Sequence, residues 1–430
     1  MKTSLFVQSH PSPDLAGAHV VRVLLRIEGE TPAREHRVPL NLSLVLDRSG
    51  SMSGGKLEAV KRAARDLVRR LHPDDRVSVV AFDDAVVTLA PPSTSAQRPD
   101  LIDQLMGIYP GGTTNLSGGW LQGRALTQTH LDPKGVNRVI LLTDGLANVG
   151  ITDGPRLRQL CSQALEGRIS TTTVGVGAGY DEELLFGMAD AGGGGSHYIE
   201  RLTDAGGVFE EELEGLLSIA AQNLTVRVQP RDAAELSVVH HSYPARTEAD
   251  GTLSLAIGDL YAREPGEVLA DFVVRTNGGA QLDLIDQAAR PVVDLVVEAD
   301  VWTEDGGLER RRISLPVTFD PEAGAETHPE VERVYTLLRA ADARRRAVEM
   351  GDRGDVKGAA RTLREAVAGV ANSSVARDVA APEMDELELL ASQMEAQGEM
   401  TAEDRKFLYT KQQMYSKGRR SAGRRLRRDR

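Results

Sequence analysis

The chain has 430 residues, enough for two to four domains at roughly 100–200 residues each. Its formal net charge is −12, and the last fifteen residues alone hold eight Lys/Arg and one Asp, which leaves −19 for the rest of the chain. A body this acidic argues against general nucleic-acid binding, because phosphate contacts need clustered cations. The single cysteine excludes an internal disulfide and cysteine-rich zinc sites.

Residues 18–27 and 36–40 form the first strand-like runs, and an alternation of strands and helices follows from 41 to 222. The alternating strands are continuously apolar, which indicates a parallel sheet covered on both faces. We therefore predict a doubly wound α/β domain over residues 41–222. The expected strands are 42–46, 76–82, 136–143, 169–176 and 197–199, and the expected helices are 56–71, 101–107, 116–128, 157–165, 181–189 and 205–222.

A β-rich region follows, in which short alternating runs are separated by turn residues. This pattern predicts an antiparallel β-sandwich over residues 223–320. The runs before residue 41 have no sheet of their own, so we expect residues 1–40 to join the sandwich and the α/β domain to be inserted between its parts. The expected sandwich strands are 224–228, 236–240, 253–257, 267–274, 292–299 and 311–319.

From Pro329 the pattern becomes helical, within a C-terminal region that we assign to residues 321–430. Amphipathic runs at 331–350 and 355–370, joined by a Gly-containing turn, predict an αα-hairpin of the tetratricopeptide type. A third helix is expected from 382 to 415, broken at Gly398. The Arg-rich tail is either a solvated segment that folds back onto the acidic body or a site for nucleic acid or an acidic partner.

Three separated loops of the α/β domain carry hard oxygen donors at the carboxyl ends of strands, where open α/β sheets bind ligands. Carboxylates and hydroxyls suit Mg²⁺, Mn²⁺ or Ca²⁺, and the lack of thiolate or imidazole in the set disfavours zinc and copper. Water or an outside carboxylate must then complete the coordination shell. The candidate metal ligands are Asp47, Ser49, Ser51, Thr113 and Asp144, with Thr114 as an alternative to its neighbour.

This set resembles the metal-ion-dependent adhesion site of the von Willebrand factor A family, and the resemblance covers about residues 39 to 222. The D-x-S-x-S motif lies at 47–51, and the separate Thr and Asp lie at 113 and 144. The resemblance implies that Ser49, Ser51 and Thr113 touch the ion directly, with one or both Asp acting partly through water. Bacterial relatives share a similar layout of flanking β segments and C-terminal helices.

Simpler explanations exist for single residues. Either aspartate alone is well explained as a helix cap at a strand-to-helix turn, whereas five matching positions in three loops favour metal binding. We expect Cys161 to be a small buried residue on a helix and His240-His241 to be an ordinary pair on a strand. The run from Gly192 to Gly195 is expected to be a flexible turn.

We expect a protein-binding module in which an Asp or Glu of a partner completes the shell of a bound Mg²⁺ (or Mn²⁺ or Ca²⁺). Resemblance to bacterial relatives implies an AAA+ ATPase or a protein of a stress or conflict system as partner. A metal-dependent phosphatase or nuclease using the same Asp pair and a scaffold with a structural metal stay open as alternatives. The chain shows no P-loop, H-E-x-x-H or G-x-S-x-G motif, so no enzyme is expected. It also shows no signal-peptide pattern and no run of roughly 20 apolar residues, so we expect a cytoplasmic protein without a membrane partner.

Overall fold

The computed structural model describes residues 1–30, 38–94, 97, 100–177, 179–199, 201–231, 234–262, 264–275, 290–303, 307–320 and 327–416. The basic tail from 417 onward lies outside these residues. The predicted options for this tail, a solvated segment or a site for nucleic acid or an acidic partner, therefore stay predictions. The chain forms two compact units. The first contains residues 1–30, 224–299 and 310–430, and the second contains residues 31–223 and 300–309.

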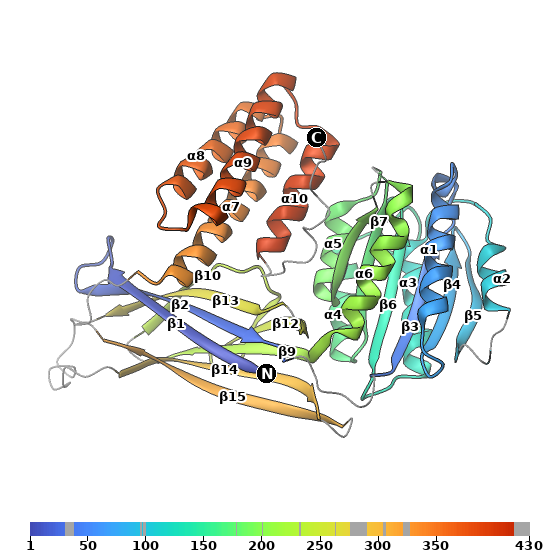
Figure 1. Ribbon diagram of the computed structural model, residues 1–430, viewed down its shortest axis with the longest axis horizontal. Coiled ribbons are helices and arrows are strands. Elements are labelled where there is room, and N and C mark those ends of the chain that lie inside the picture. The colour runs from blue at the N-terminus through green and yellow to red at the C-terminus, as the bar shows by residue number, and fades with distance from the viewer. Residues whose placement is uncertain are drawn as a thin grey trace. The chain divides into compact units, whose positions relative to one another are not determined.

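The second unit is built on a six-stranded sheet with the order β5-β4-β3-β6-β7-β8 (Figure 1). All neighbouring strands are parallel except β5, which runs antiparallel to β4. The α/β fold class is therefore confirmed, but the sheet is mixed instead of purely parallel. The strands are β3 (Leu40–Asp47), β4 (Arg76–Phe82), β5 (Val86–Thr94), β6 (Val136–Thr143), β7 (Ser170–Val176) and β8 (Gly193–Ile199).

The strand order reverses at β3, which pairs with β4 on one side and with β6 on the other. Every residue of β3 and of β6 is buried, so these two strands form the centre of the core. The loops that follow β3 and β6 begin at the same edge of the sheet and lead away from the reversal point. This is the position at which open α/β sheets bind ligands.

Helices cover both faces of this sheet (Figure 1). α1 packs with α6, and α4 packs with α5. One apolar cluster joins the sheet to α3, α4 and α5, and it includes Trp120 and the buried Cys161, as expected for that residue. The helices are α1 (Lys56–Arg70), α2 (Leu101–Met106), α3 (Leu116–Thr129), α4 (Gly154–Glu166), α5 (Glu182–Ala191) and α6 (Ala205–Leu217), with short 3₁₀ turns η1 (Gly50–Met52) and η3 (Leu202–Asp204).

Two expectations in this unit are wrong. The last helix ends at Leu217 instead of 222, because Ile219 to Ala221 are buried at the start of the next strand. The glycine run is not a flexible turn, since β8 begins at Gly193. A Cβ atom at Gly194 would lie 2.1 Å from the Thr171 carbonyl oxygen, so glycine allows β8 to approach β7 closely.

The first unit contains two sheets, with orders β1-β2-β13-β10 and β11-β12-β9-β14-β15. β1 and β2 pair with each other and β2 pairs with β13, so the N-terminal strands belong to the β-rich region, as the fold prediction required. Leu224 of β9 and Leu260 of β12 pack against Gly266 at the start of β13, which brings the sheets face to face. The strands are β1 (Lys2–Pro11), β2 (Ala18–Glu28), β9 (Ile219–Pro230), β10 (Ala234–Val239), β11 (Ala245–Thr247), β12 (Leu253–Tyr261), β13 (Gly266–Arg275), β14 (Arg290–Trp302) and β15 (Leu308–Phe319).

The expected histidine strand pair is also wrong, because β10 ends before these residues. The His241 ring is buried, accepts a hydrogen bond from the Leu269 backbone N–H at 3.0 Å and stacks on Tyr243. Burial, together with the neighbouring His240, lowers the pKa of His241 to about 3. The ring is therefore a neutral part of the core.

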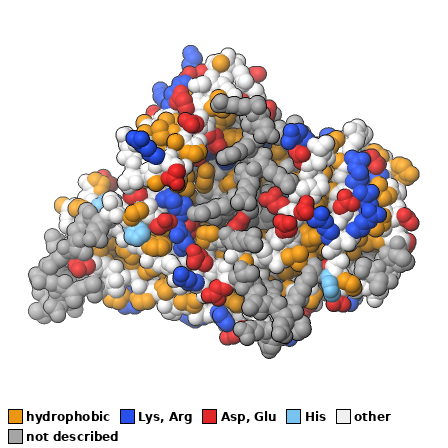
Figure 2. Space-filling model, viewed as in Figure 1, with side chains coloured by type: hydrophobic (Ala, Val, Ile, Leu, Met, Phe, Trp, Pro, Cys, Tyr) orange, Lys and Arg blue, Asp and Glu red, His pale blue; other side chains and the backbone are white. Residues whose placement is uncertain are grey.

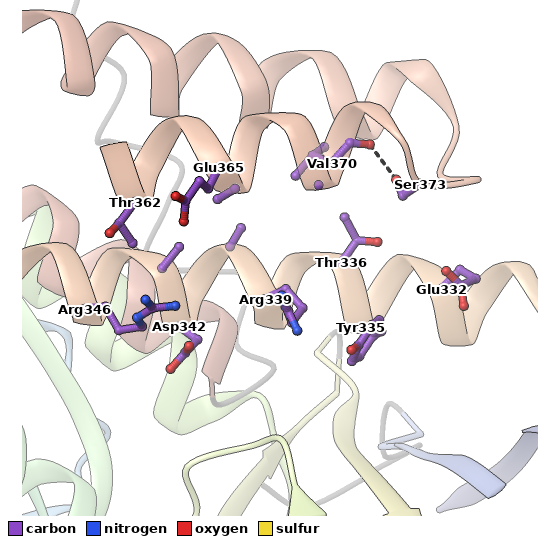
Figure 3. Close-up of a pocket in the computed structure, with 14 residues that line it drawn as sticks. Glu332, Tyr335, Thr336, Arg339, Asp342, Arg346, Thr362, Glu365, Val370 and Ser373 are labelled. Atoms are coloured by element: carbon purple, nitrogen blue, oxygen red, sulfur yellow. Dashed lines mark hydrogen bonds between the residues drawn. The ribbon is translucent and has the colours of Figure 1, made fainter. Parts of the chain in front are cut away.

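Helices complete the first unit, and their bounds are α7 (Pro329–Asp352), α8 (Val356–Ala371), α9 (Arg377–Gln397) and α10 (Ala402–Ser416). The break at Gly398 is confirmed, and this residue adopts the left-handed conformation that ends α9. The third helix nevertheless begins at Arg377, and Pro382 lies inside its second turn instead of at its start. α7 and α8 form the expected hairpin, and a groove of about 380 Å³ between them is lined by small and charged side chains (Figure 3).

α7 also packs on the β1-β2-β13 face. Val331, Val334 and Leu338 of the helix contact Leu24 and Leu269 of the sheet. Around this apolar contact, polar pairs cross the same junction, including Gln8 with Glu332 and Arg26 with Glu330. The sandwich and the helical region are consequently one compact unit. None of the helices among the described residues has the length and hydrophobicity that a membrane span requires.

A buried charged network fixes α6 to the sheet of the second unit. Arg138 of β6 is fully buried, and its guanidinium donates to Glu212 of α6 at 3.3 Å and to Thr172 at 2.8 Å. The second Glu212 carboxylate oxygen lies 2.9 Å from Nε2 of His197. Burial by itself would raise the pKa of Glu212, but the hydrogen bond to His197 and the charge of Arg138 lower it to about 2.

Changing Glu212→Gln should destabilise the second unit by about 3–5 kcal/mol, since it removes a buried negative charge that pairs with the Arg138 guanidinium and with His197. The measurement is urea unfolding followed by tryptophan fluorescence, because the buried Trp120 of α3 lies in the core of this unit. Glu214→Gln on the exposed side of the same helix is the matched control and should change stability by less than about 0.5 kcal/mol. Equal effects of the two substitutions would contradict the role of the network.

The stability difference between the native chain and Glu212→Gln should depend on pH. A carboxyl with a lowered folded-state pKa contributes stability that is complete above its unfolded value, here 4.5, and is lost as the pH falls toward about 2. The difference should therefore shrink when urea unfolding is repeated at decreasing pH from about 5 to about 3. A difference that stays constant over this range would show that Glu212 does not titrate as the network requires.

Candidate metal centre

Asp47 is the last residue of β3, and its carboxylate is fully buried. One carboxylate oxygen accepts the Ser49 backbone N–H at 2.7 Å, and the other accepts the hydroxyl of Thr143, the last residue of β6, at 2.5 Å. Burial raises the pKa of Asp47, and the hydrogen bonds from Thr143 and Ser49 only partly oppose this. The carboxylate is thus held by the neutral donors Ser49 and Thr143.

Ser49, Ser51 and Asp144 meet directly beside Asp47. The two serine hydroxyl oxygens are 3.0 Å apart, and the Ser51 hydroxyl donates to one oxygen of Asp144 at 2.7 Å. Ser49 and Asp144 are buried, whereas Ser51 is exposed to solvent. Four of the five predicted ligands therefore lie within one connected cluster that opens to the surface at Ser51.

Lys56 at the start of α1 is a member of the site that the sequence analysis missed. Its Nζ donates to the second Asp144 oxygen at 2.5 Å and to the Ser51 carbonyl oxygen at 3.3 Å. The ammonium offsets the charge of one of the two buried carboxylates. Two carboxylates with one ammonium leave the cluster with a net charge of about −1, which is costly in a buried place unless another cation is present.

Backbone hydrogen bonds tie the three loops together. The N–H of Gly50 donates to Gly112 at 2.9 Å, and the N–H of Gly111 donates to Arg48 at 2.7 Å. On the other side, the N–H groups of Asn148 and Val149 both donate to the carbonyl oxygen of Thr114, at 3.0 and 3.2 Å. Backbone hydrogen bonds between the loops thus fix the relative positions of the candidate ligand side chains.

The threonine loop is the one place where the structure separates two adjacent candidates. The side chain of Thr113 is exposed, and no contact joins it to the other four residues within the described part of the chain. Thr114 is buried, and its hydroxyl oxygen lies 3.2 Å from the point that a Cβ atom of Gly145 would occupy, while the Ser51 hydroxyl lies 3.6 Å from the same point. The geometry therefore favours Thr114 as the threonine of the cluster, although Thr113 stays the prediction made from the sequence.

Asp83, immediately after β4, is hydrogen-bonded to the loop that contains Gly111 and Gly112. Its carboxylate accepts the backbone N–H groups of Ala85 at 2.9 Å and Gly112 at 3.3 Å, and it pairs with Arg48 at 3.0 Å. Burial would raise the pKa of Asp83, but these donors lower it. The residue was missed, although its place at the carboxyl end of a central strand was a signal that could have found it.

The donor set fits a hard divalent cation. Oxygens on neighbouring vertices of an octahedron around Mg²⁺ are about 2.9 Å apart, given metal–oxygen distances of about 2.0–2.1 Å. The Ser49–Ser51 and Ser51–Asp144 oxygen separations of 3.0 and 2.7 Å match this spacing. Among the residues that the structure describes, no group of three or more His, Cys, Asp or Glu could hold a metal ion, so hydroxyls are essential to this candidate.

Residues 41–211 match the family model of the von Willebrand factor type A domain. This segment has the fold of a von Willebrand factor type A domain and is called the A domain below. The matched range contains the six-stranded sheet except the first residue of β3, the helices on both of its faces up to the middle of α6, and every residue of the candidate site. The A domain therefore occupies most of the second unit.

The full chain is similar to an uncharacterized protein of Synechocystis sp., with 26% identity over 82% of this chain and 84% of that protein. The protein YfbK of Escherichia coli is 26% identical over 48% of this chain, and the inter-alpha-trypsin inhibitor heavy chain H3 of Mesocricetus auratus is 29% identical over 48% of it. These matches cover only 37% and 24% of the two relatives' own lengths. The similarities are those expected of a protein-interaction module.

Two solved structures share the fold over nearly the whole chain. A von Willebrand factor type A protein from Catenulispora acidiphila aligns with a TM-score of 0.67 and 16% identity, covering 97% of both chains. The ArnB paralog VWA2 from Sulfolobus acidocaldarius aligns with a TM-score of 0.58 and 16% identity, covering 96% of this chain and 97% of that one. At this identity the likeness concerns the fold, including the β-rich and helical parts that accompany the A domain.

Substitution by Ala at the two adjacent glycines Gly111 and Gly112 should change the free energy of unfolding by different amounts. A Cβ atom at either Gly111 or Gly112 would lie 1.9 Å from a carboxylate oxygen, that of Asp83 or of Asp84 respectively. Asp83 is buried and held by three partners, whereas Asp84 is exposed and free to turn away. Gly111→Ala should therefore cost about 1–3 kcal/mol in urea unfolding, and Gly112→Ala clearly less. The reverse order would show that Asp83 does not anchor the loop.

Proposed function

We propose that the A domain binds a divalent cation and uses it to hold an acidic side chain of a partner protein. The observation that carries this proposal is the Ser51 hydroxyl, which lies 3.0 Å from the Ser49 hydroxyl and 2.7 Å from Asp144 at a solvent-exposed point beside buried Asp47. This arrangement brings neutral oxygens and carboxylates from separate loops to one accessible place.

The cation would be held directly by Ser49, Ser51 and Thr114, with Asp144 beside them. Both oxygens of Asp47 already accept hydrogen bonds, so Asp47 would act through water or through its charge. The ion would be Mg²⁺, or Mn²⁺ or Ca²⁺, because all the donors are hard oxygens. It would also supply the positive charge that the two buried carboxylates lack, in competition with Lys56 for Asp144.

A coordination shell with so few charged protein ligands leaves positions around the cation that water or a carboxylate of another protein can fill. A partner's Asp or Glu would replace water there and gain a strong electrostatic contact with the ion. Partners such as an AAA+ ATPase or a protein of a stress or conflict system belong to this proposal. On the face shown in Figure 2, acidic and basic side chains are interspersed, so this face offers no uniform basic surface for nucleic acid.

Calorimetric titration with Mg²⁺ tests the proposal, and the Thr pair provides a matched comparison. Thr114→Ala should weaken Mg²⁺ binding by about 10–100-fold, as loss of groups that hold a metal typically does, while Thr113→Ala should change it by less than about twofold. Asp47→Asn should also weaken binding strongly, because it removes a buried negative charge without changing the shape of the side chain. The fold of each variant is checked by urea unfolding.

The outcomes separate the alternatives. Absence of Mg²⁺, Mn²⁺ and Ca²⁺ binding to the native chain would refute the proposal, and loss of binding in Thr113→Ala alone would return the ligand role to that residue. Cation-dependent turnover of phosphate ester or nucleic-acid substrates, abolished by Asp47→Asn, would instead establish a hydrolase. A cation that raises the unfolding midpoint but leaves partner capture unaffected by EDTA would establish a structural metal.

A further inference from the structure

Large exposed apolar side chains lie on two loops of the candidate site. Among the described residues, Tyr109, Leu146 and Val149 are 74%, 54% and 37% exposed. They account for three of the eight large hydrophobic side chains that stand out into solvent there, and all three lie on the two loops that carry Thr114 and Asp144. Together they are called the apolar rim below. Clustering of exposed apolar groups beside a polar site is typical of an interaction surface.

The rim is held in place by its surroundings. The loop after Asp144 is bonded to Thr114 through the N–H groups of Asn148 and Val149, and the N–H of Ile151 donates to the Ser117 hydroxyl of α3 at 2.8 Å. Gly150 adopts a positive φ of 78°, and a Cβ atom there would lie 2.4 Å from the same hydroxyl. Leu146 and Val149 therefore lie on a loop packed against the N-terminus of α3.

The rim also lacks charge. Residues 109–115 and 145–152 contain no Asp, Glu, Lys or Arg, in a chain in which 27% of residues are charged. The basic side chains of Arg48 and Lys56 are paired with Asp83 and Asp144, and the Lys61 ammonium lies 5.8 Å from the centre of the Tyr109 ring. A partner segment that lies across residues 145–152 would meet neutral and apolar side chains beside the cation, whereas the exposed Asp84 carboxylate lies next to Gly112 of the other loop.

We infer that the partner offers one acidic residue flanked by large apolar residues, with the acid at the cation and its neighbours on the apolar rim. This inference rests on the proposed function and specifies the partner for the same site. A polyacidic segment fits poorly, because its additional carboxylates would lie on the uncharged loop 145–152 or near the exposed carboxylate of Asp84. Association should accordingly depend weakly on salt, since few charges are paired in the complex.

The test uses the full chain saturated with Mg²⁺ and four fluorescent peptides with identical Gly/Ser ends, read by fluorescence anisotropy. The first has a central Asp flanked on each side by Leu and Phe, the second has the same Asp flanked by Ser, the third has it flanked by Glu, and the fourth replaces Asp by Asn between apolar flanks. The apolar-flanked Asp peptide should bind at least about tenfold more tightly than the other three, given the free energy of burying one large apolar side chain.

The variant Leu146→Ser/Val149→Ser should remove this preference for apolar flanks while leaving the Mg²⁺ titration unchanged. Val87→Ser is the matched control, because Val87 is similarly exposed at 39% but lies on the edge strand β5. Failure of Mg²⁺ to bind the native chain would refute the proposed function itself. If Mg²⁺ binds normally, three results would overturn the inference and leave the proposed function intact. These are equally tight binding of the Ser- or Glu-flanked peptide, no binding of any peptide, and a rim variant that keeps the preference for apolar flanks.

Discussion

The hydrogen bond from Thr143 to Asp47 joins the ends of two adjacent parallel strands, and the candidate site is arranged around it. It exists because β3 and β6 are neighbours, with Leu46 paired to Leu142, so the next residue of each strand emerges at the same edge. The chain diverges from that edge in opposite directions, and the following loops bring Ser49, Ser51 and Asp144 back together. A carboxylate buried here is costly, and the neutral donors around it leave its charge uncompensated.

Much of this arrangement could be predicted from the sequence, because central strands of a covered sheet are continuous apolar runs. Asp47 ends the apolar run of β3 and Asp144 directly follows that of β6, so the sequence alone assigns both residues to one edge of the sheet. The edge strands were harder. β1 is largely half-buried and β5 contains two prolines, so neither has the apolar run that marks a buried strand.

The sequence predicts Thr113 as the ligand with Thr114 as the alternative, whereas burial in the fold favours Thr114. Both carry the same hydroxyl, and which one turns inward depends on how the glycines before them bond to the loop after β3. Lys56 was missed for a related reason. It reads as an ordinary solvated residue of an amphipathic helix, and only the fold brings its ammonium to Asp144. Similarly, the pattern of α7 predicted an amphipathic helix but could not show that part of its apolar face covers the β1-β2-β13 sheet.

The most direct measurement of the central claim is an anomalous-difference map from crystals of the full chain grown with Mn²⁺. The account predicts a single strong peak bonded to the hydroxyls of Ser49, Ser51 and Thr114, with the Lys56 ammonium no longer in contact with Asp144. The account would be contradicted if Mn²⁺ bound elsewhere and left no peak at this position. It would also be contradicted if, at saturating Mn²⁺, the Lys56–Asp144 pair stayed intact and no density appeared between the loops.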